Sequence, residues 1–181
     1  MTTALILVDI QNDYFPGGRM ALVGMDAAAD AAAGLLGRFR NRGLPVVHVR
    51  HESLQPGATF FLPDTAGAAI ADNVLPISGE PVITKHFPNS FRDTDLLNRL
   101  QAAAVSRVVI CGAMSHMCID ATTRAAADHG LACMVAADAC ATRDLQFKDI
   151  TVPAAHVHAA FMAALAAAYG QVSPSGKIPL D

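Results

Sequence analysis

Three reactive side chains stand close behind apolar runs of this 181-residue sequence. Asp9 follows the run LILV, Lys85 follows PVIT, and Cys118 lies a few residues beyond VSRVVIC. In open parallel sheets, ligands bind beyond the carboxyl ends of the strands, so side chains at these places are candidates for chemistry. A thiol, a carboxylate and an ammonium supply a nucleophile, a base and an electrostatic partner, which is what covalent acyl transfer requires.

The segment around Cys118 adds two expectations. Cys118 should begin a helix that runs to His129, where free N–H groups and the positive end of the helix dipole favour a thiolate. Gly112, Ala113 and Met114 form a turn of small residues before that helix, and its N–H groups could point at a developing oxyanion. The alternative is that Cys118 is a buried small hydrophobe, as free cysteines often are.

The elements that must position these residues follow from the apolar runs and helical patterns. Strands are expected at 5–8, 45–49, 81–84, 105–111, 131–137 and 171–173. Helices are expected at Asp26–Arg42, about Thr94–Ala104 with Asp93 as its N-cap, 118–129 and Pro153–Tyr169. Strands that are apolar throughout indicate a parallel sheet buried on both faces. Right-handed crossovers then predict an α/β fold, a three-layer α/β/α arrangement in one domain over residues 1–181.

Three sequence blocks resemble those of a known family. The segments LILVDIQNDYFPGG, VITKHFPNSF and CGAMSHMCIDATTRAAADHG are similar to the blocks of the isochorismatase-like cysteine hydrolases, which include nicotinamidases, N-carbamoylsarcosine amidases and enzymes that cleave ureides or biuret. DACATRD and the Pro-capped final helix are also similar, so the resemblance covers nearly the whole chain. It implies a six-stranded, mainly parallel, Rossmann-like sheet in the order 3-2-1-4-5-6. It also implies a triad of Asp9, Lys85 and Cys118.

The resemblance further implies a reaction. Cys118 would attack a non-peptide C–N bond of amide, ureide or carbamoyl type in a small molecule and form a thioester, while Asp9 takes the thiol proton and returns it to the leaving amine. A non-proline cis peptide is implied at Ala113–Met114, with the N–H groups of Met114 and Cys118 as the oxyanion hole. Two alternatives stay open: vinyl-ether hydrolysis of isochorismate, whose dedicated hydrolases typically lack the nucleophilic cysteine, and a non-catalytic or redox-sensing thiol protein on the same fold.

The substrate pocket should be shaped by the long stretch between the second and third strands, Arg50 to Glu80, which contains Pro and Gly. Seven side chains in or beside loops near the strand ends could line it: Phe15, Arg50, Phe60, Phe61, Phe91, His116 and Phe147. Phenylalanine at such places is more often part of the core, and Arg50 could equally form a surface salt bridge.

No cofactor and no metal are expected. The nicotinamidases carry a metal on an Asp-x-His motif, and the corresponding strand here reads VVHVRHES. His48 and His51 are three apart and would face opposite sides of a strand, and His156 and His158 do not share a helix face. Neither of the glycine-rich nucleotide-binding motifs, G-x-G-x-x-G and G-x-x-x-x-G-K-[ST], follows a strand, which disfavours a nucleotide-binding module.

The composition excludes several classes of protein. Hydrophobic residues make up 52% of the chain and charged residues 16%, which excludes disorder. A net charge of −3 without a basic cluster disfavours nucleic-acid binding. The small number of charges predicts a homo-oligomer, either a dimer or a tetramer. Without a signal-like segment or an apolar span, the expectation is a soluble cytoplasmic protein, not bound to a membrane, with reduced cysteines.

Overall fold

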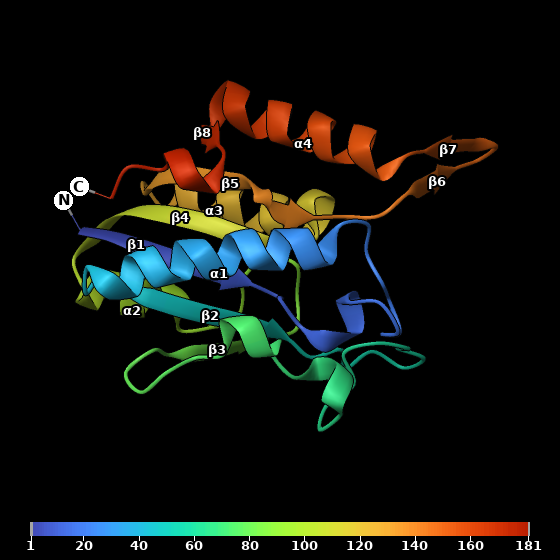
Figure 1. The fold of residues 1–181 in the computed structure, drawn as a ribbon, viewed down its shortest axis with the longest axis horizontal. Coiled ribbons are helices and arrows are strands. Elements are labelled where there is room, and N and C mark those ends of the chain that lie inside the picture. The colour runs from blue at the N-terminus through green and yellow to red at the C-terminus, as the bar shows by residue number, and fades with distance from the viewer. Residues whose placement is uncertain (1, 181) are drawn as a thin grey trace.

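The structure is a computed structural model that describes residues 2–180, and its main sheet has six parallel strands (Figure 1). These are β1 (Thr2–Val8), β2 (Val46–His51), β3 (Val82–Lys85), β4 (Val105–Ala113), β5 (Ala132–Ala141) and β8 (Gly170–Ser173). Their order is β3-β2-β1-β4-β5-β8, and each neighbouring pair is parallel. The predicted order 3-2-1-4-5-6 is confirmed, with β8 as the sixth strand of the sheet.

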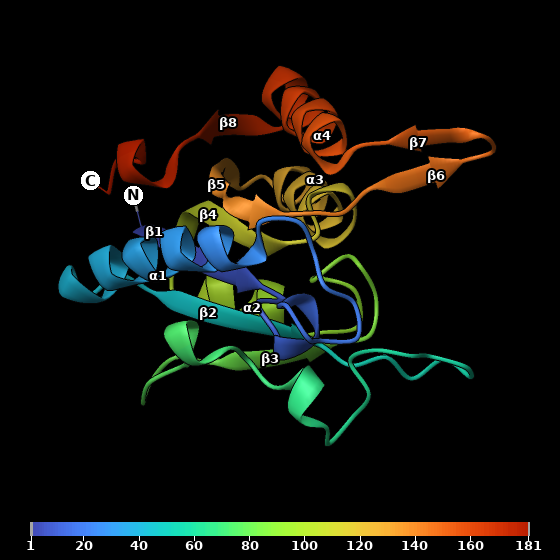
Figure 2. The ribbon, with the colours of Figure 1, turned by 45° about the vertical axis from the view of Figure 1, so that its right-hand side comes forward.

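Helices cover both faces of this sheet, so the expected three layers are confirmed (Figures 1 and 2). The α-helices are α1 (Met25–Asn41), α2 (Leu96–Ala102), α3 (Asp120–Asp128) and α4 (Ala154–Ala168). The buried residues of α1 belong to one hydrophobic cluster, whereas α2, α3 and α4 contribute Leu96, Leu100, Ala126, Met162 and Leu165 to the cluster on the opposite face. Among residues 2–180, no helix has the length and apolar character needed to cross a membrane.

Strand β1 shows how the sequence produces this layering. Its side chains alternate between the two clusters: Leu5 and Leu7 pack with α1, whereas Ala4, Ile6 and Val8 pack on the other face. Because both faces are buried, every second position need not be polar, and the strand reads as a continuous apolar run.

Two elements differ from the sequence-based expectation. Helix α2 begins at Leu96, because Asp93 has a positive φ of 55° and the Leu96 N–H is met by Oγ1 of Thr94 at 3.4 Å. The prediction of Asp93 as N-cap was therefore wrong. An antiparallel hairpin of β6 (Leu145–Phe147) and β7 (Ile150–Val152) was not predicted and extends from the body in Figure 1. Its strands are short and largely exposed, so they leave no buried periodic pattern.

Strand register brings the reactive residues to one edge of the sheet. Val8 pairs with Gly112, so the residues that follow both strands are neighbours. His51 pairs with Lys85 at the ends of β2 and β3. Gly112 is required here: its φ is 123°, and a Cβ atom would collide with the carbonyl oxygen of Val8.

Candidate active site

Cys118 lies in one turn of π-helix, Ser115–Ile119, that joins β4 to α3. Helix α3 begins at Asp120, so the expectation that Cys118 starts the α-helix was wrong by this single turn. Met117 and Ile119 both donate their N–H groups to the carbonyl of Met114, which fixes the turn. Such π-turns occur often at functional sites. Cys118 itself is 6% exposed.

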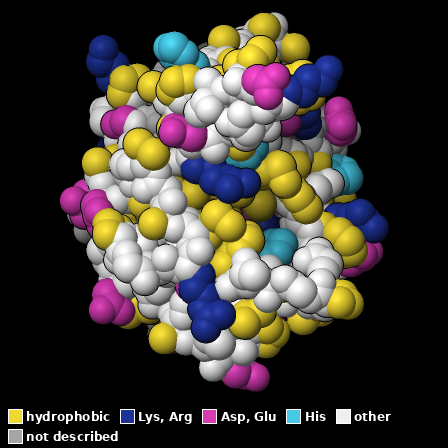
Figure 3. Space-filling model, turned by 90° about the vertical axis from the view of Figure 1, so that its right-hand side faces the viewer, with side chains coloured by type: hydrophobic (Ala, Val, Ile, Leu, Met, Phe, Trp, Pro, Cys, Tyr) yellow, Lys and Arg dark blue, Asp and Glu magenta, His cyan; other side chains and the backbone are white. Residues whose placement is uncertain are grey.

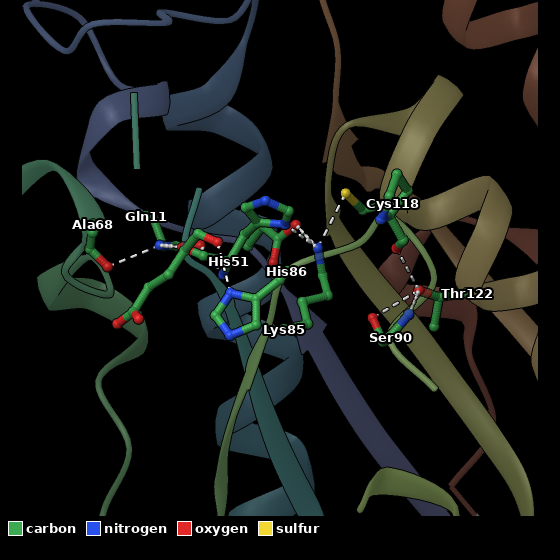
Figure 4. A network of polar contacts seen from close by, with 11 residues as sticks. Gln11, His51, Ala68, Lys85, His86, Ser90, Cys118 and Thr122 are labelled. Carbon is green, nitrogen blue, oxygen red and sulfur yellow. Dashed lines mark hydrogen bonds and ion pairs between the residues drawn. The ribbon is translucent and has the colours of Figure 1, made fainter. Parts of the chain in front are cut away.

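Lys85 joins the three chain segments of the site. Its Nζ atom lies 2.6 Å from Oδ2 of Asp9, 3.0 Å from Nδ1 of His51 and 3.2 Å from Sγ of Cys118 (Figure 4). The side chains of Lys85 and Asp9 are both fully buried. An ammonium has three N–H donors, so each donor has one acceptor here. This arrangement brings together the three residues that the sequence singled out.

The carboxylate of Asp9 is satisfied on one side only. Oδ2 accepts from Lys85, whereas Oδ1 is buried and has no hydrogen-bond partner in residues 2–180. A carboxylate oxygen of Asp9, a ring nitrogen of His51 and Sγ of Cys118 all lie within 4.8 Å of one another. Asp9 also has a left-handed backbone with φ of 54°, which is uncommon outside glycine and is tolerated by aspartate. A buried, half-satisfied carboxylate beside a thiol can accept the thiol proton.

Burial sets the resting protonation states. It raises the pKa of Cys118 to about 12, with a further rise from Asp9 and an opposing effect of Lys85. Burial alone would lower the pKa of Lys85, but Asp9 and Cys118 outweigh this and raise it. Burial and the Lys85 charge lower the pKa of His51 to about 4. The direction of each shift favours a thiol, an ammonium and a neutral imidazole at neutral pH, whereas the position near a helix terminus had favoured a thiolate.

A cavity of about 410 Å³ opens onto Cys118. Its wall comes from the segment 53–61 after β2, the segment 86–88 after β3, Tyr14, His51, Met114 and Met117. The stretch between β2 and β3 does shape the pocket, and Phe60 and Phe61 do line it, as expected. The Ala113–Met114 peptide is cis, at the position that the resemblance implies, and Met114 and Cys118 face the same cavity.

The structure places the other five expected pocket residues outside this wall, which corrects that prediction. Phe15 is partly buried and packs against the first hydrophobic cluster. Arg50 is held at 3.0 Å by Thr84 Oγ1 and at 2.9 Å by Glu52, the salt bridge that was the alternative.

The remaining three are held by other partners. Phe91 packs on the second core cluster, and its ring lies tilted against that of His129, with ring centres 5.1 Å apart. His116 contacts Oγ1 of Thr142 at 2.6 Å. Phe147 is 67% exposed on the hairpin. The sequence shows how many residues separate these five side chains from the strand ends. It does not show in which direction the loops that carry them run.

Four site residues were missed by sequence reasoning, and three of them lie in the first block. Gln11 clamps the His51 backbone, with the His51 N–H donating to Oε1 at 2.7 Å and Nε2 donating to the His51 carbonyl at 2.9 Å. The carboxylate of Asp13 accepts the Phe61 N–H at 2.6 Å, and Tyr14 lies in the cavity wall. The available signal was the spacing of polar residues at 9, 11 and 13 directly after a buried strand.

The histidines separate into different environments. His48 faces away from the site and contacts Glu80 at 2.8 Å, as expected for a residue three before His51 on a strand. His158 contacts Ser115 Oγ at 2.9 Å. Asp9, His51 and Cys118 carry atoms that can ligate a metal, and all three contact the ammonium of Lys85.

The fold and this site define a three-layer α/β protein with a candidate cysteine active site at the carboxyl edge of its sheet. The family model described as the isochorismatase domain matches residues 3–173. The chain is 56% identical over 172 residues to YddQ, an uncharacterized isochorismatase family protein of Bacillus subtilis (strain 168). The aligned region covers 95% of this chain and 96% of the relative. The chain belongs to the isochorismatase family of hydrolases.

Two further relatives support this assignment. A crystal structure from Oleispira antarctica, assigned to the isochorismatase hydrolases, superposes with a TM-score of 0.93 at 57% identity, covering 97% of this chain and 95% of that one. Maleamate amidohydrolase of Pseudomonas putida is 31% identical over 146 residues, covering 73% of this chain and 68% of the relative. The family therefore includes amidohydrolases.

Proposed function

We propose that this protein is a cysteine hydrolase that cleaves a non-peptide C–N bond, of amide, ureide or carbamoyl type, in a small molecule. The observation that carries the proposal is the buried contact of Lys85 with both Asp9 and Cys118 at the end of a cavity. A nucleophile, a base with a free oxygen and a cation lie within reach of one bound substrate, which is the requirement for covalent catalysis. An amidohydrolase among the relatives is consistent with this chemistry.

The reaction begins with the neutral thiol. Asp9 Oδ1 accepts the Cys118 proton while Sγ attacks the substrate carbonyl carbon, and the carbonyl electrons move to its oxygen. The N–H groups of Met114 and Cys118 hold that oxyanion. The ammonium of Lys85 stabilises negative charge on sulfur as the proton leaves. Because burial and the Asp9 charge both favour the protonated thiol, we infer that proton transfer to Asp9 accompanies attack rather than preceding it.

The second half of the reaction regenerates the thiol. As the tetrahedral intermediate collapses, the C–N bond breaks and the leaving nitrogen takes the proton from Asp9, which leaves a thioester on Cys118. Water then adds to the thioester carbonyl and gives a proton to Asp9. The C–S bond breaks, the acid is released, and the proton returns to the sulfur.

The test is turnover and adduct trapping with a panel of primary amides and ureides. Ammonia release by the wild type, a mass increase on Cys118 after rapid acid quench, and loss of both in Cys118→Ala are expected. We expect the Cys118→Ala rate to fall by about 10³-fold or more. Cys133→Ala is the matched control, because Cys133 is also buried but lies on β5 outside the cavity.

Two results would contradict the proposal. Undiminished turnover in Cys118→Ala would refute the nucleophile. Pyruvate release from isochorismate, with no ammonia released from any amide, would favour vinyl-ether hydrolysis instead.

A further inference from the structure

The inside of the active-site cavity is aromatic on one side. Tyr14 and Phe61 pack with ring centres 4.5 Å apart, and Phe60 lies 5.0 Å from Phe61. Phe87 and Met117 contribute further apolar surface. A small ligand that reaches Cys118 must pass along these side chains. An apolar or aromatic group gains free energy there because it leaves water for a surface of the same kind.

The same wall contains no Asp, Glu, Lys or Arg among the residues that the structure describes. The cation nearest to Cys118 is Lys85, whose three N–H donors already meet Asp9, His51 and the thiol. Nδ1 of His51 accepts from that ammonium, and the ring of His86 is bound through Nδ1 to the Glu52 carbonyl at 2.8 Å. Among the residues that line the cavity, a carboxylate would therefore meet neither a free ammonium nor a guanidinium.

Basic side chains are found at the border of the cavity and not within it. Figure 3 views the molecule from the side where the strands end, and it shows a hollow with apolar and histidine side chains, bordered by Lys and Arg side chains. Three exposed arginines act on wall residues without lining the cavity themselves. Nη1 of Arg19 donates to the Thr59 carbonyl at 3.3 Å, and the Arg92 guanidinium lies 3.6 Å from the ring centre of Phe87. The charge of Arg143 opposes the rise that burial gives to the pKa of Tyr14. A charge held in water at the rim does not compensate a carboxylate that is buried next to the thiol.

The aromatic side is held in place by a buried anion. Asp13 is 4% exposed, and its carboxylate accepts the N–H groups of Phe61 at 2.6 Å and Arg19 at 3.2 Å. Phe61 has a positive φ of 54°, and its carbonyl accepts from Ser53 at 2.9 Å, which closes the loop 53–61. Gly67 allows this packing, because a Cβ atom there would overlap the Asp13 carboxylate. The loop therefore has anchors at both ends, and the wall is preformed.

Resting on the function proposed above, we propose that the substrate is an uncharged amide or ureide whose acyl part is a compact apolar or aromatic group, seated against Tyr14, Phe61 and Phe87. An acyl part with a carboxylate close to the reacting carbonyl is excluded, because the charge would be buried without a partner.

The test uses pairs of amides that differ by one carboxylate. Crotonamide and fumaramate form one pair, and benzamide and 4-carbamoylbenzoate form the other. The first pair is short, so its carboxylate is held close to the reacting carbonyl. We expect kcat/KM for the neutral member of each pair to be higher by about tenfold or more. An equal or higher value for the anionic members would overturn the inference while leaving the proposed hydrolase function intact.

Binding to Cys118→Ala, measured by isothermal titration calorimetry with the same pairs, separates this inference from the proposed function. Tighter binding of the neutral members by about tenfold or more supports the inference even if the wild type turns over neither pair. In that case the proposed hydrolysis would be contradicted, whereas the preference of the cavity for uncharged amides would be supported. No binding of any neutral member, or equal binding of both members, would overturn the inference.

A charge-switch variant tests the electrostatic cause. Met117 lines the cavity and is 41% exposed, so an arginine there has room to reach an anion. Met117→Arg should shift the preference toward the anionic member of each pair by about tenfold. Met117→Leu, the uncharged control, should keep the preference of the wild type. If Met117→Arg leaves the ratio of kcat/KM for the neutral and anionic members unchanged, the lack of a cation in the cavity wall is not the cause of the preference.

Discussion

Nδ1 of His51 lies 3.0 Å from Nζ of Lys85 and accepts the third of its hydrogen bonds. The pKa of His51 is lowered to about 4, so the ring is neutral at physiological pH and its Nδ1 lone pair is free to accept. Gln11 fixes the backbone of His51 from both sides. His51 is therefore a positioning residue: it holds the ammonium that contacts Asp9 and Cys118.

Removing this acceptor should slow the reaction. In His51→Leu one buried N–H of Lys85 loses its partner, and we expect kcat to fall by about tenfold to a hundredfold. His51→Gln has a similar volume and keeps an acceptor, so it should recover a substantial part of the loss. Steady-state kinetics on an amide accepted by the wild type checks this. Equal rates for the leucine and glutamine variants would show that only the volume of the side chain matters.

The same histidine makes stability depend on pH. Its pKa is about 6.5 when unfolded and about 4 when folded, so the unfolded chain binds the proton more readily. This contribution is fully present above about pH 6.5 and is lost as the pH falls toward 4; it amounts to roughly 1–3 kcal/mol. Urea unfolding of the wild type and His51→Gln at several pH values should show a smaller loss in the variant. Parallel curves would contradict the lowered pKa.

The Asp9 charge should control how reactive the resting thiol is. Asp9 raises the pKa of Cys118 and Lys85 lowers it, so Asp9→Asn leaves only the effect of Lys85 against burial. We expect iodoacetamide to modify Cys118 about tenfold faster at pH 8 in Asp9→Asn, although amide turnover is lost. Peptide mass spectrometry resolves the four cysteines.

Asp120→Asn is the matched control, because Asp120 pairs with Arg124 at 2.9 Å. Slower labelling in Asp9→Asn than in the wild type would contradict the assignment. Fast labelling of the wild type at neutral pH would instead suit a redox-sensing thiol, since such thiols have a low pKa and are accessible.

The buried ion pair should matter for folding as well as for chemistry. Lys85→Met leaves the Asp9 carboxylate buried without its cation, which should destabilise the protein by about 3–5 kcal/mol. In the double variant with Asp9→Asn no charge is stranded, so the loss should be smaller than the sum of the single effects. Chemical denaturation of the four proteins measures this. Additive losses would mean that the two charges do not interact.

The predicted homo-oligomer has a candidate surface. Helix α4 contains no Asp, Glu, Lys or Arg, and the adjoining hairpin exposes Phe147 at 67% and Ile150 at 62%. We propose that copies of the chain associate through this surface. Sedimentation velocity should show a dimer or tetramer for the wild type and dissociation for Phe147→Asp with Ile150→Asp. Ile77→Asp, also an exposed apolar residue, is the control. A monomeric wild type would contradict the prediction.

Local patterns in the sequence determined most of the fold. The six strands and their layers could be predicted from the apolar runs, the helical patterns and the glycines that end helices. A strand buried on both faces is apolar at consecutive positions, so it can be recognised in the sequence. The hairpin from Leu145 to Val152 has no such apolar run, since most of its residues are exposed. Helix α2 began later than expected, because Asp93 takes a left-handed backbone with φ of 55° in place of an N-cap conformation.

The sequence by itself also determined which three residues carry the candidate chemistry, since Asp9, Lys85 and Cys118 each stand at or beyond the end of a strand at the same edge of the sheet. Only the tertiary structure decided how they act. Burial raises the pKa of Cys118 and so favours the thiol, whereas a helix terminus favours the thiolate. His51 has its role through a contact with Lys85, 34 residues away, and Asp13 through a contact with Phe61, 48 residues away. Desolvation and such long-range contacts depend on how distant segments pack, and no local pattern encodes them.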